Sequence, residues 1–136
     1  MTRPDAGKAA IALLLWVTAA ALVSTSELLP GDSAAMRWLG MLQISDKLIH
    51  FAAYTLLAFI PCFGFRWRTG IALAGLSIVL GVALEFAQRL VPGRSFEVAD
   101  MLANALGVAT GGALGMLVRR AATARGRELA KSKAGQ

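Results

Sequence analysis

The sequence predicts an all-α integral membrane protein, built as a four-helix bundle with both termini in the cytoplasm. Of its 136 residues, 57% are hydrophobic and only 16% are charged. A soluble domain of this length needs more polar surface than that. Long uncharged stretches also alternate with short charged ones, which is typical of membrane proteins. The length allows one compact unit of a few helices.

The first predicted membrane helix covers residues 9–26, which carry no charge. At about 1.5 Å per residue this stretch reaches about 27 Å, close to the ~30 Å of a hydrocarbon core. Residues 1–8 precede it as a short polar lead on the cytoplasmic side. A cleaved signal peptide is the alternative. We disfavour it because the apolar run is long and Val23-Ser24-Thr25 is a poor cleavage site.

The second predicted membrane helix covers residues 48–65 and follows a loop that runs from Glu27 to Lys47. Pro30-Gly31-Asp32 in that loop is a turn signal. The middle of the loop, residues 34–39, is mildly amphipathic. Pro61 should kink the second helix, which membrane helices tolerate.

The third predicted membrane helix covers residues 71–91. The short basic turn before it, Arg66 to Gly70, makes the second and third helices antiparallel neighbours. The segment is apolar until Glu85, and Pro92-Gly93 ends it.

The fourth predicted membrane helix covers residues 101–118. It carries glycines at four-residue intervals, which let another helix approach closely. We therefore expect helix packing at Gly107, Gly111 and Gly115. Residues 119–136 follow as a basic, weakly structured cytoplasmic tail. The domain boundaries are thus 1–8, 9–118 and 119–136.

The distribution of basic residues predicts the orientation. Ten of the fourteen Lys and Arg lie in the two terminal segments and the Arg66–Gly70 turn, which share one side of the membrane. This side should be cytoplasmic. The net charge of +6 then reflects contact with anionic membrane lipids, and we expect no nucleic acid partner. The single cysteine, Cys62, excludes an intrachain disulfide.

Polar residues gather at the other, outer ends of the helices. On their helices they follow intervals of three or four residues, so each group forms one stripe. A charged stripe in lipid must turn toward the bundle interior, and ionisable residues there are functional candidates. The alternative is that they only pair with one another and hold the bundle together. The expected ligand-binding residues are Asp46, His50, Tyr54, Glu85, Gln88, Arg89, Arg94, Asp100 and Asn104.

The chemistry of these residues suits a lipid-linked ligand. Arg89 and Arg94 can bind a phosphate or carboxylate in bidentate fashion. Glu85 should pair with Arg94, or alternatively with Arg89, because a lone ionised carboxylate is costly at that depth. Glu85 or His50 could also act as a general base. We expect no cofactor and no metal, because nearby Arg and Lys oppose cation binding.

Three ordered motifs carry a resemblance to a known family. They are Asp46-Lys47-x-x-His50-Phe51-x-x-Tyr54, then Glu85-x-x-Gln88-x-x-x-Pro92-x-Arg94, then Asp100-x-x-x-Asn104-x-x-Gly107-x-x-x-Gly111. Together they resemble the VanZ-like family of small bacterial membrane proteins, over about residues 46–115. The family is named for a protein associated with teicoplanin resistance. The resemblance implies a role in the cell envelope but no defined reaction.

We therefore expect a multi-pass protein of the bacterial inner membrane that acts at its outer face. The leading hypothesis is a non-enzymatic module that binds a lipid-linked envelope precursor or a glycopeptide antibiotic. A small membrane enzyme acting on a lipid headgroup is the second hypothesis. The third is a scaffold subunit of an envelope polysaccharide synthase. A catalytic partner would then be a separate protein.

Overall fold

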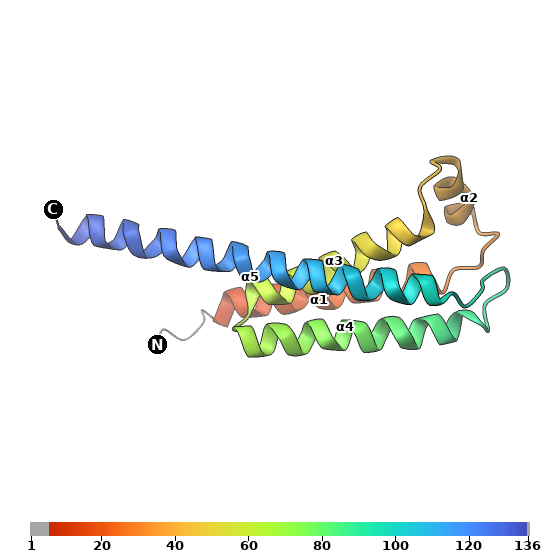
Figure 1. Ribbon diagram of the computed structural model, residues 1–136, viewed down its shortest axis with the longest axis horizontal. Helices are drawn as coiled ribbons and strands as arrows, with labels where there is room; N and C mark the ends of the chain where they lie inside the picture. Colours follow the sequence, from red (N-terminus) through yellow and green to blue (C-terminus); the bar gives the residue numbers. More distant parts are fainter. Residues whose placement is uncertain (1–5, 136) are drawn as a thin grey trace.

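The computed structural model describes residues 6–135, and within that range the chain is helical without any strand. Four long helices lie side by side, and a short one lies beyond them at one end (Figure 1). The helices are α1 (Ala6–Glu27), α2 (Ala34–Met41), α3 (Asp46–Gly64), α4 (Trp67–Gln88) and α5 (Val98–Ala134).

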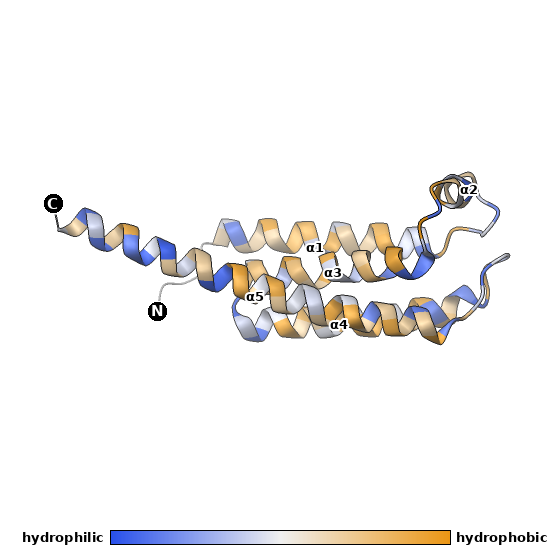
Figure 2. Ribbon diagram, turned by 45° about the horizontal axis from the view of Figure 1, so that its top comes forward, coloured by the Kyte–Doolittle hydropathy of each residue, from blue (hydrophilic) through white to orange (hydrophobic). Residues whose placement is uncertain are grey.

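The four long helices are each long and apolar enough to cross a membrane. Figure 2 shows apolar residues along their shared length and hydrophilic residues toward the ends of the bundle. The predicted all-α fold with four candidate membrane spans is therefore confirmed. The short α2 lies in the predicted loop before the second span, where the sequence is mildly amphipathic, and Ser33 caps it by accepting a hydrogen bond from the backbone of Met36.

The helix bounds differ from the predicted ones in an informative way. The first helix does not end at Ser26 but includes Glu27, since nothing prevents it from continuing until the chain reaches Pro30. The third spanning helix begins earlier than predicted, at Trp67, and ends at Gln88 rather than at residue 91. Of the predicted lead, residues 6–8 already belong to α1, and residues 1–5 lie outside the described range.

The expected weakly structured tail is wrong, because α5 continues as one helix to Ala134. The residues after position 118 are mostly Ala, Arg, Lys, Glu and Leu, which have high helix propensity, and no proline interrupts them. The extension projects beyond the bundle from the end where α1 begins (Figure 1). A high density of charge indicated solvent exposure here, not lack of structure.

The closest helix contact joins α3 and α5. A methyl group built on Gly107 would lie 2.5 Å from the carbonyl oxygen of Phe51, and one on Gly115 would lie 2.7 Å from that of Phe59. One on Gly111 would overlap the carbonyl of Thr55. The three glycines therefore lie directly against the backbone of α3, and they bring the two helices close enough to fix their relative register.

The bundle has two distinct ends. The end that carries α2 and the α4–α5 loop is called the loop end, and the opposite one, where α5 projects, is called the basic end (Figure 1). At the loop end the backbone N–H of Gly31 donates to the carbonyl of Pro92 (3.1 Å). The close approach needs glycine, since a side chain at position 31 would overlap the carbonyl of Gly93, which itself has φ +72°. The two connecting loops are thus held together.

Candidate functional site

Buried polar side chains from all four long helices meet at the loop end. Each of them is at most 5% exposed. More exposed charged residues surround them, on the first turn of α3 and on the α4–α5 loop. We call the whole set the polar cluster; it comprises Glu27, Asp46, Lys47, His50, Glu85, Gln88, Arg94, Glu97, Asp100 and Asn104.

His50 lies at the centre of the polar cluster. Its Nδ1 is 3.0 Å from the side-chain oxygen of Asn104, a hydrogen bond in which a protonated Nδ1 donates to the amide. The same nitrogen lies 3.6 Å from a carboxylate oxygen of Glu27, and Nε2 lies 3.9 Å from one of Asp100. One imidazole of α3 therefore links α1 and α5, and the hydrogen bond from Nδ1 leaves Nε2 free to accept a proton.

Glu27 is a site residue that the sequence analysis missed. It was assigned to a loop, yet it is the last residue of α1 and is only 5% exposed. A signal was present, because Glu27 directly follows the uncharged span and precedes Pro30 by three residues. A helix that continues toward the proline carries this carboxylate to the same level as His50.

Glu85 does not pair with either predicted arginine. Its carboxylate is fully buried and accepts a 2.6 Å hydrogen bond from the backbone N–H of Glu97. Within the described part of the chain, no basic side chain lies within 4.0 Å of it. The expected Glu85–Arg94 ion pair is therefore wrong, because the α4–α5 loop folds a backbone donor over this carboxylate instead of a guanidinium.

Arg94 instead holds the loops together. Its guanidinium donates to the carbonyl oxygens of Leu29 (3.1 Å) and Ser26 (3.2 Å), and it lies 3.8 Å from a carboxylate oxygen of Asp46. These contacts use most of its donors to close the end of α1. The expected role of Arg94 as a direct anion ligand therefore loses support.

Arg89 contacts two aromatic rings and has no hydrogen bond or ion pair with the polar cluster among the described residues. Its guanidinium lies 4.2 Å from the ring centre of Phe96 and 5.1 Å from that of Phe86, and both are cation–π contacts. The two rings also contact each other, with centroids 5.2 Å apart. Arg89 is exposed, so it presents a positive charge on the surface beside the α4–α5 loop.

Lys47 and Glu97 form the exposed rim of the polar cluster, and neither was among the predicted site residues. The Lys47 ammonium donates to the Glu97 carboxylate at 2.8 Å and lies 3.4 Å from an oxygen of Asp100. The hydrogen bond from Lys47 holds the pKa of Glu97 below its ordinary value. This pair fastens the start of α5 to the start of α3.

Tyr54 and Gln88 lie deeper than the rest of the predicted set. Tyr54 is fully buried in the apolar core, and its ring fills the space beside Gly81, where a methyl group would come within 2.8 Å. Gln88 ends α4 with its amide buried. Tyr54 therefore supports the polar cluster from below and is not open to a ligand.

Several buried polar atoms of the polar cluster have no hydrogen-bond partner among residues 6–135. A buried polar group without a partner costs about 1–3 kcal/mol, so these atoms need water or a ligand. The atoms without a partner are Glu27 Oε2, Glu85 Oε2, Gln88 Nε2 and Asn104 Nδ2; Asp100 Oδ1 also lacks a hydrogen bond but lies 3.4 Å from the Lys47 ammonium. A narrow cleft of about 50 Å³ opens between α1, α2 and α3 beside Glu27, the one residue among them that lines it, together with Asp46, His50 and Arg94.

Three residues of the polar cluster could hold a metal ion. Asp46, His50 and Asp100 each offer one ligand atom, and these atoms lie within 4.8 Å of one another. However, Arg94 and Lys47 lie 3.8 Å and 3.4 Å from the two carboxylates and already act as their counterions. A metal would have to displace both, so the expected absence of a metal stays a prediction.

Comparison with known proteins places the chain in one family. A family model described as VanZ/LLP1 matches residues 9–119, which is most of the chain and includes all four spanning segments. No curated protein and no solved structure was found to match.

Proposed function

The chain belongs to the VanZ/LLP1 family, and from this premise we propose that it binds the polar headgroup of a lipid-linked envelope precursor. The binding site is the polar cluster, at the outer face of the bacterial inner membrane, and binding involves no chemical reaction. Four candidate membrane spans and the family support a membrane protein.

The orientation rests on the distribution of basic residues. Both ends of the described chain lie at the basic end, which carries the Arg66–Gly70 turn and the long extension of α5 (Figure 1). Together with Lys8 on the first turn of α1, these two segments hold nine of the fourteen Lys and Arg. Because such an excess favours the cytoplasmic side, the loop end faces outward.

The unpartnered atoms of the polar cluster are the observation that carries the proposal. Four helices can be packed without burying several ionisable groups, and glycine contacts already hold α3 and α5 together. Internal ion pairs alone also fail to explain the site, since Glu85 has only a backbone donor and Glu27 keeps an oxygen, Oε2, without a hydrogen bond among the described residues. A bound polar group would satisfy these atoms.

The acceptors and donors indicate the kind of headgroup. Glu27 and Asp46 line the cleft, and Asp100 lies 3.9 Å from the ring of His50, which also lines it. Their carboxylates can accept from hydroxyl, amide or ammonium groups, which sugars and peptides provide. Arg89, exposed on the adjoining surface, can receive the phosphate. The cleft between α1, α2 and α3 is too small for a whole headgroup. The ligand therefore inserts one polar group into it, and the rest of the headgroup lies over the exposed rim formed by Lys47 and Glu97.

Native mass spectrometry of protein purified in mild detergent tests this proposal. The wild type should retain a polyprenyl-phosphate-linked lipid, and Asp100→Asn should retain much less. Glu128→Gln is the matched control, because Glu128 is an exposed acid of the same helix that pairs only with Lys131 among the described residues. Equal retention by wild type and Asp100→Asn would refute the proposal. Capture of a glycopeptide antibiotic instead of the lipid would change the ligand.

The geometry of His50 favours one alternative, a small membrane enzyme. An imidazole oriented by Asn104 through Nδ1, with a free Nε2 near Asp100, has the arrangement of a general base. Glu85 is a weaker candidate base than the sequence suggested, because its carboxylate is fully buried and hydrogen-bonded. If the protein is an enzyme, the wild type should turn over the headgroup and His50→Gln should not; a pure binder shows no turnover in either form.

A further inference from the structure

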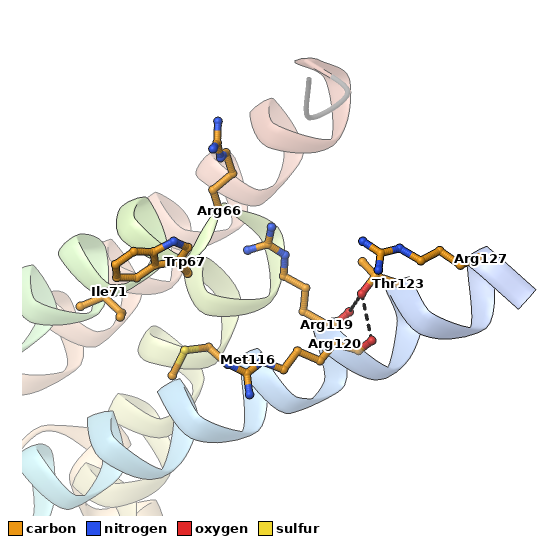
Figure 3. A pocket seen from close by; sticks show the side chains of 8 residues that line it. All are labelled: Arg66, Trp67, Ile71, Met116, Arg119, Arg120, Thr123 and Arg127. Atoms are coloured by element: carbon orange, nitrogen blue, oxygen red, sulfur yellow. Dashed lines mark hydrogen bonds between the residues drawn. The ribbon is translucent and has the colours of Figure 1, made fainter. Parts of the chain in front are cut away.

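A second cleft lies at the basic end, the end of the bundle opposite the polar cluster. It has a volume of about 610 Å³, within the ~300–1,000 Å³ range of small-molecule sites. Two parts of the chain form it: the α3–α4 turn with the first turn of α4, and the stripe of α5 that faces them. Figure 3 shows the lining residues, which are Arg66, Trp67, Ile71, Met116, Arg119, Arg120, Thr123 and Arg127.

The cleft exists because α5 continues as a helix beyond the bundle. Arg119, Thr123 and Arg127 follow at four-residue intervals, so they share one face of α5. Arg119 donates to the carbonyl of Phe65 at the end of α3, which fixes the extension beside the α3–α4 turn. A disordered tail would not place these residues opposite Arg66.

The positive charge of the cleft is not neutralised within the described chain. No carboxylate lines the cleft, and no ion pair in residues 6–135 involves Arg66, Arg120 or Arg127. The acid nearest in sequence, Glu128, pairs with Lys131. Guanidinium groups around one cleft, with no acidic partner there, attract a phosphate, which they can bind in bidentate fashion.

Apart from Thr123, whose hydroxyl donates to the backbone of α5, the remaining lining is apolar and indicates contact with the membrane. Ile71 lies on the first turns of α4, and Met116 lies one turn before Arg119 on α5; both belong to spanning segments. Trp67 is exposed at the start of α4 with Arg68 over its ring, 5.2 Å from the centre. Tryptophan at this level is typical of a membrane–water interface.

We propose that this cleft binds the phosphodiester headgroup of an anionic glycerophospholipid. The arginines hold the phosphate, while an acyl chain runs along Ile71 and Met116 into the bilayer. The apolar side of the cleft favours a lipid over a free phosphate ion, which would need only the charges. This site is separate from the polar cluster and does not depend on the function proposed for it.

Lipid binding to the purified full-length protein tests the proposal. In native mass spectrometry with added phosphatidylglycerol or phosphatidylcholine, the wild type should bind phosphatidylglycerol preferentially. The double variant Arg120→Gln/Arg127→Gln should weaken that binding by about tenfold or more, because each basic residue near an anionic lipid adds to the attraction. Arg125→Gln is the control, since Arg125 lies on the same helix but does not line the cleft.

Three results would overturn the proposal. Equal binding of both lipids would show that charge does not select the ligand. Unchanged phosphatidylglycerol binding in the double variant, with the same thermal stability as wild type, would show that the lipid binds elsewhere. Full competition by millimolar inorganic phosphate would identify a free phosphate as the ligand. Arg119 is left intact in these variants because its hydrogen bond to Phe65 holds α5 in place.

Discussion

Replacing Gly111 by alanine should destabilise the bundle strongly for so small a change. The added methyl group would overlap the carbonyl oxygen, carbonyl carbon and Cα of Thr55. These are backbone atoms of a helix, so they cannot move aside as a flexible side chain would. Carbon atoms need about 3.5–4.0 Å between them, and α3 would have to retreat by on the order of 1 Å.

The cost can be estimated against a matched neighbour. Gly112→Ala adds the same methyl group one residue along, where it would meet only the sulfur of Cys62 at 3.7 Å, an ordinary contact. Both variants gain the same helix propensity from alanine. The difference between them is therefore the overpacking term, about 1–3 kcal/mol. Gly111→Leu should prevent folding, because lipid offers no hydrophobic compensation for separated helices.

The single cysteine provides the assay. Cys62 is buried and lies on α3 beside Gly115, so a thiol-reactive fluorophore labels it when α3 and α5 separate. Thermal unfolding in detergent should show Gly111→Ala well below both the wild type and Gly112→Ala. If the two alanine variants unfold at the same temperature, α5 does not pack on α3 through this glycine and the helix register described above is wrong.

Three further predictions concern the loop end and the orientation. Reporters fused to the C-terminus and inserted next to α2 should report opposite sides of the membrane, and the same side for both would refute the four-span topology. Lys47 lowers the pKa of Glu97, so their pair stabilises the fold above the ordinary pKa of Glu97 and loses this effect as pH falls through the lowered value. The unfolding temperature of Glu97→Gln should therefore fall less on acidification than that of the wild type. An equal fall in both proteins would contradict this. Glu85→Ala and Arg94→Ala should reduce stability additively, since the two side chains share no contact; a coupling above about 0.5 kcal/mol in a double-mutant cycle would restore the pair that the sequence suggested.

The residues that the sequence placed correctly are those whose position follows from helix periodicity. His50 lies one helical turn from Asp46, and Asn104 lies one turn from Asp100. The spacing alone therefore predicts that each pair shares one polar face of its helix. The apolar character of the spans then required both stripes to face inward. The structure joins them through the hydrogen bond from His50 to Asn104.

The partners of the arginines could not be derived in this way. Whether Arg94 folds toward Glu85 or toward α1 depends on the path of a turn whose glycine has a positive φ, and on the Pro30-Gly31 turn that packs against it. Both are contacts between distant segments. Glu27 was missed for a related reason. A charged residue at the end of an apolar run normally marks the end of the membrane helix, and only the tertiary packing shows that Glu27 is buried.

The α3–α5 contact and the polar cluster depend on each other. Asn104 continues the same stripe of α5 that carries Gly107 and Gly111, and His50 lies about one turn before Tyr54 on the facing helix. Unpartnered buried atoms cost stability, and the close backbone contact lies directly below them, where it can offset that cost. The same contact fixes the distance from His50 to Asn104. A bundle packed through flexible side chains would let that distance vary, so the glycines serve to position the site as well as to hold the fold.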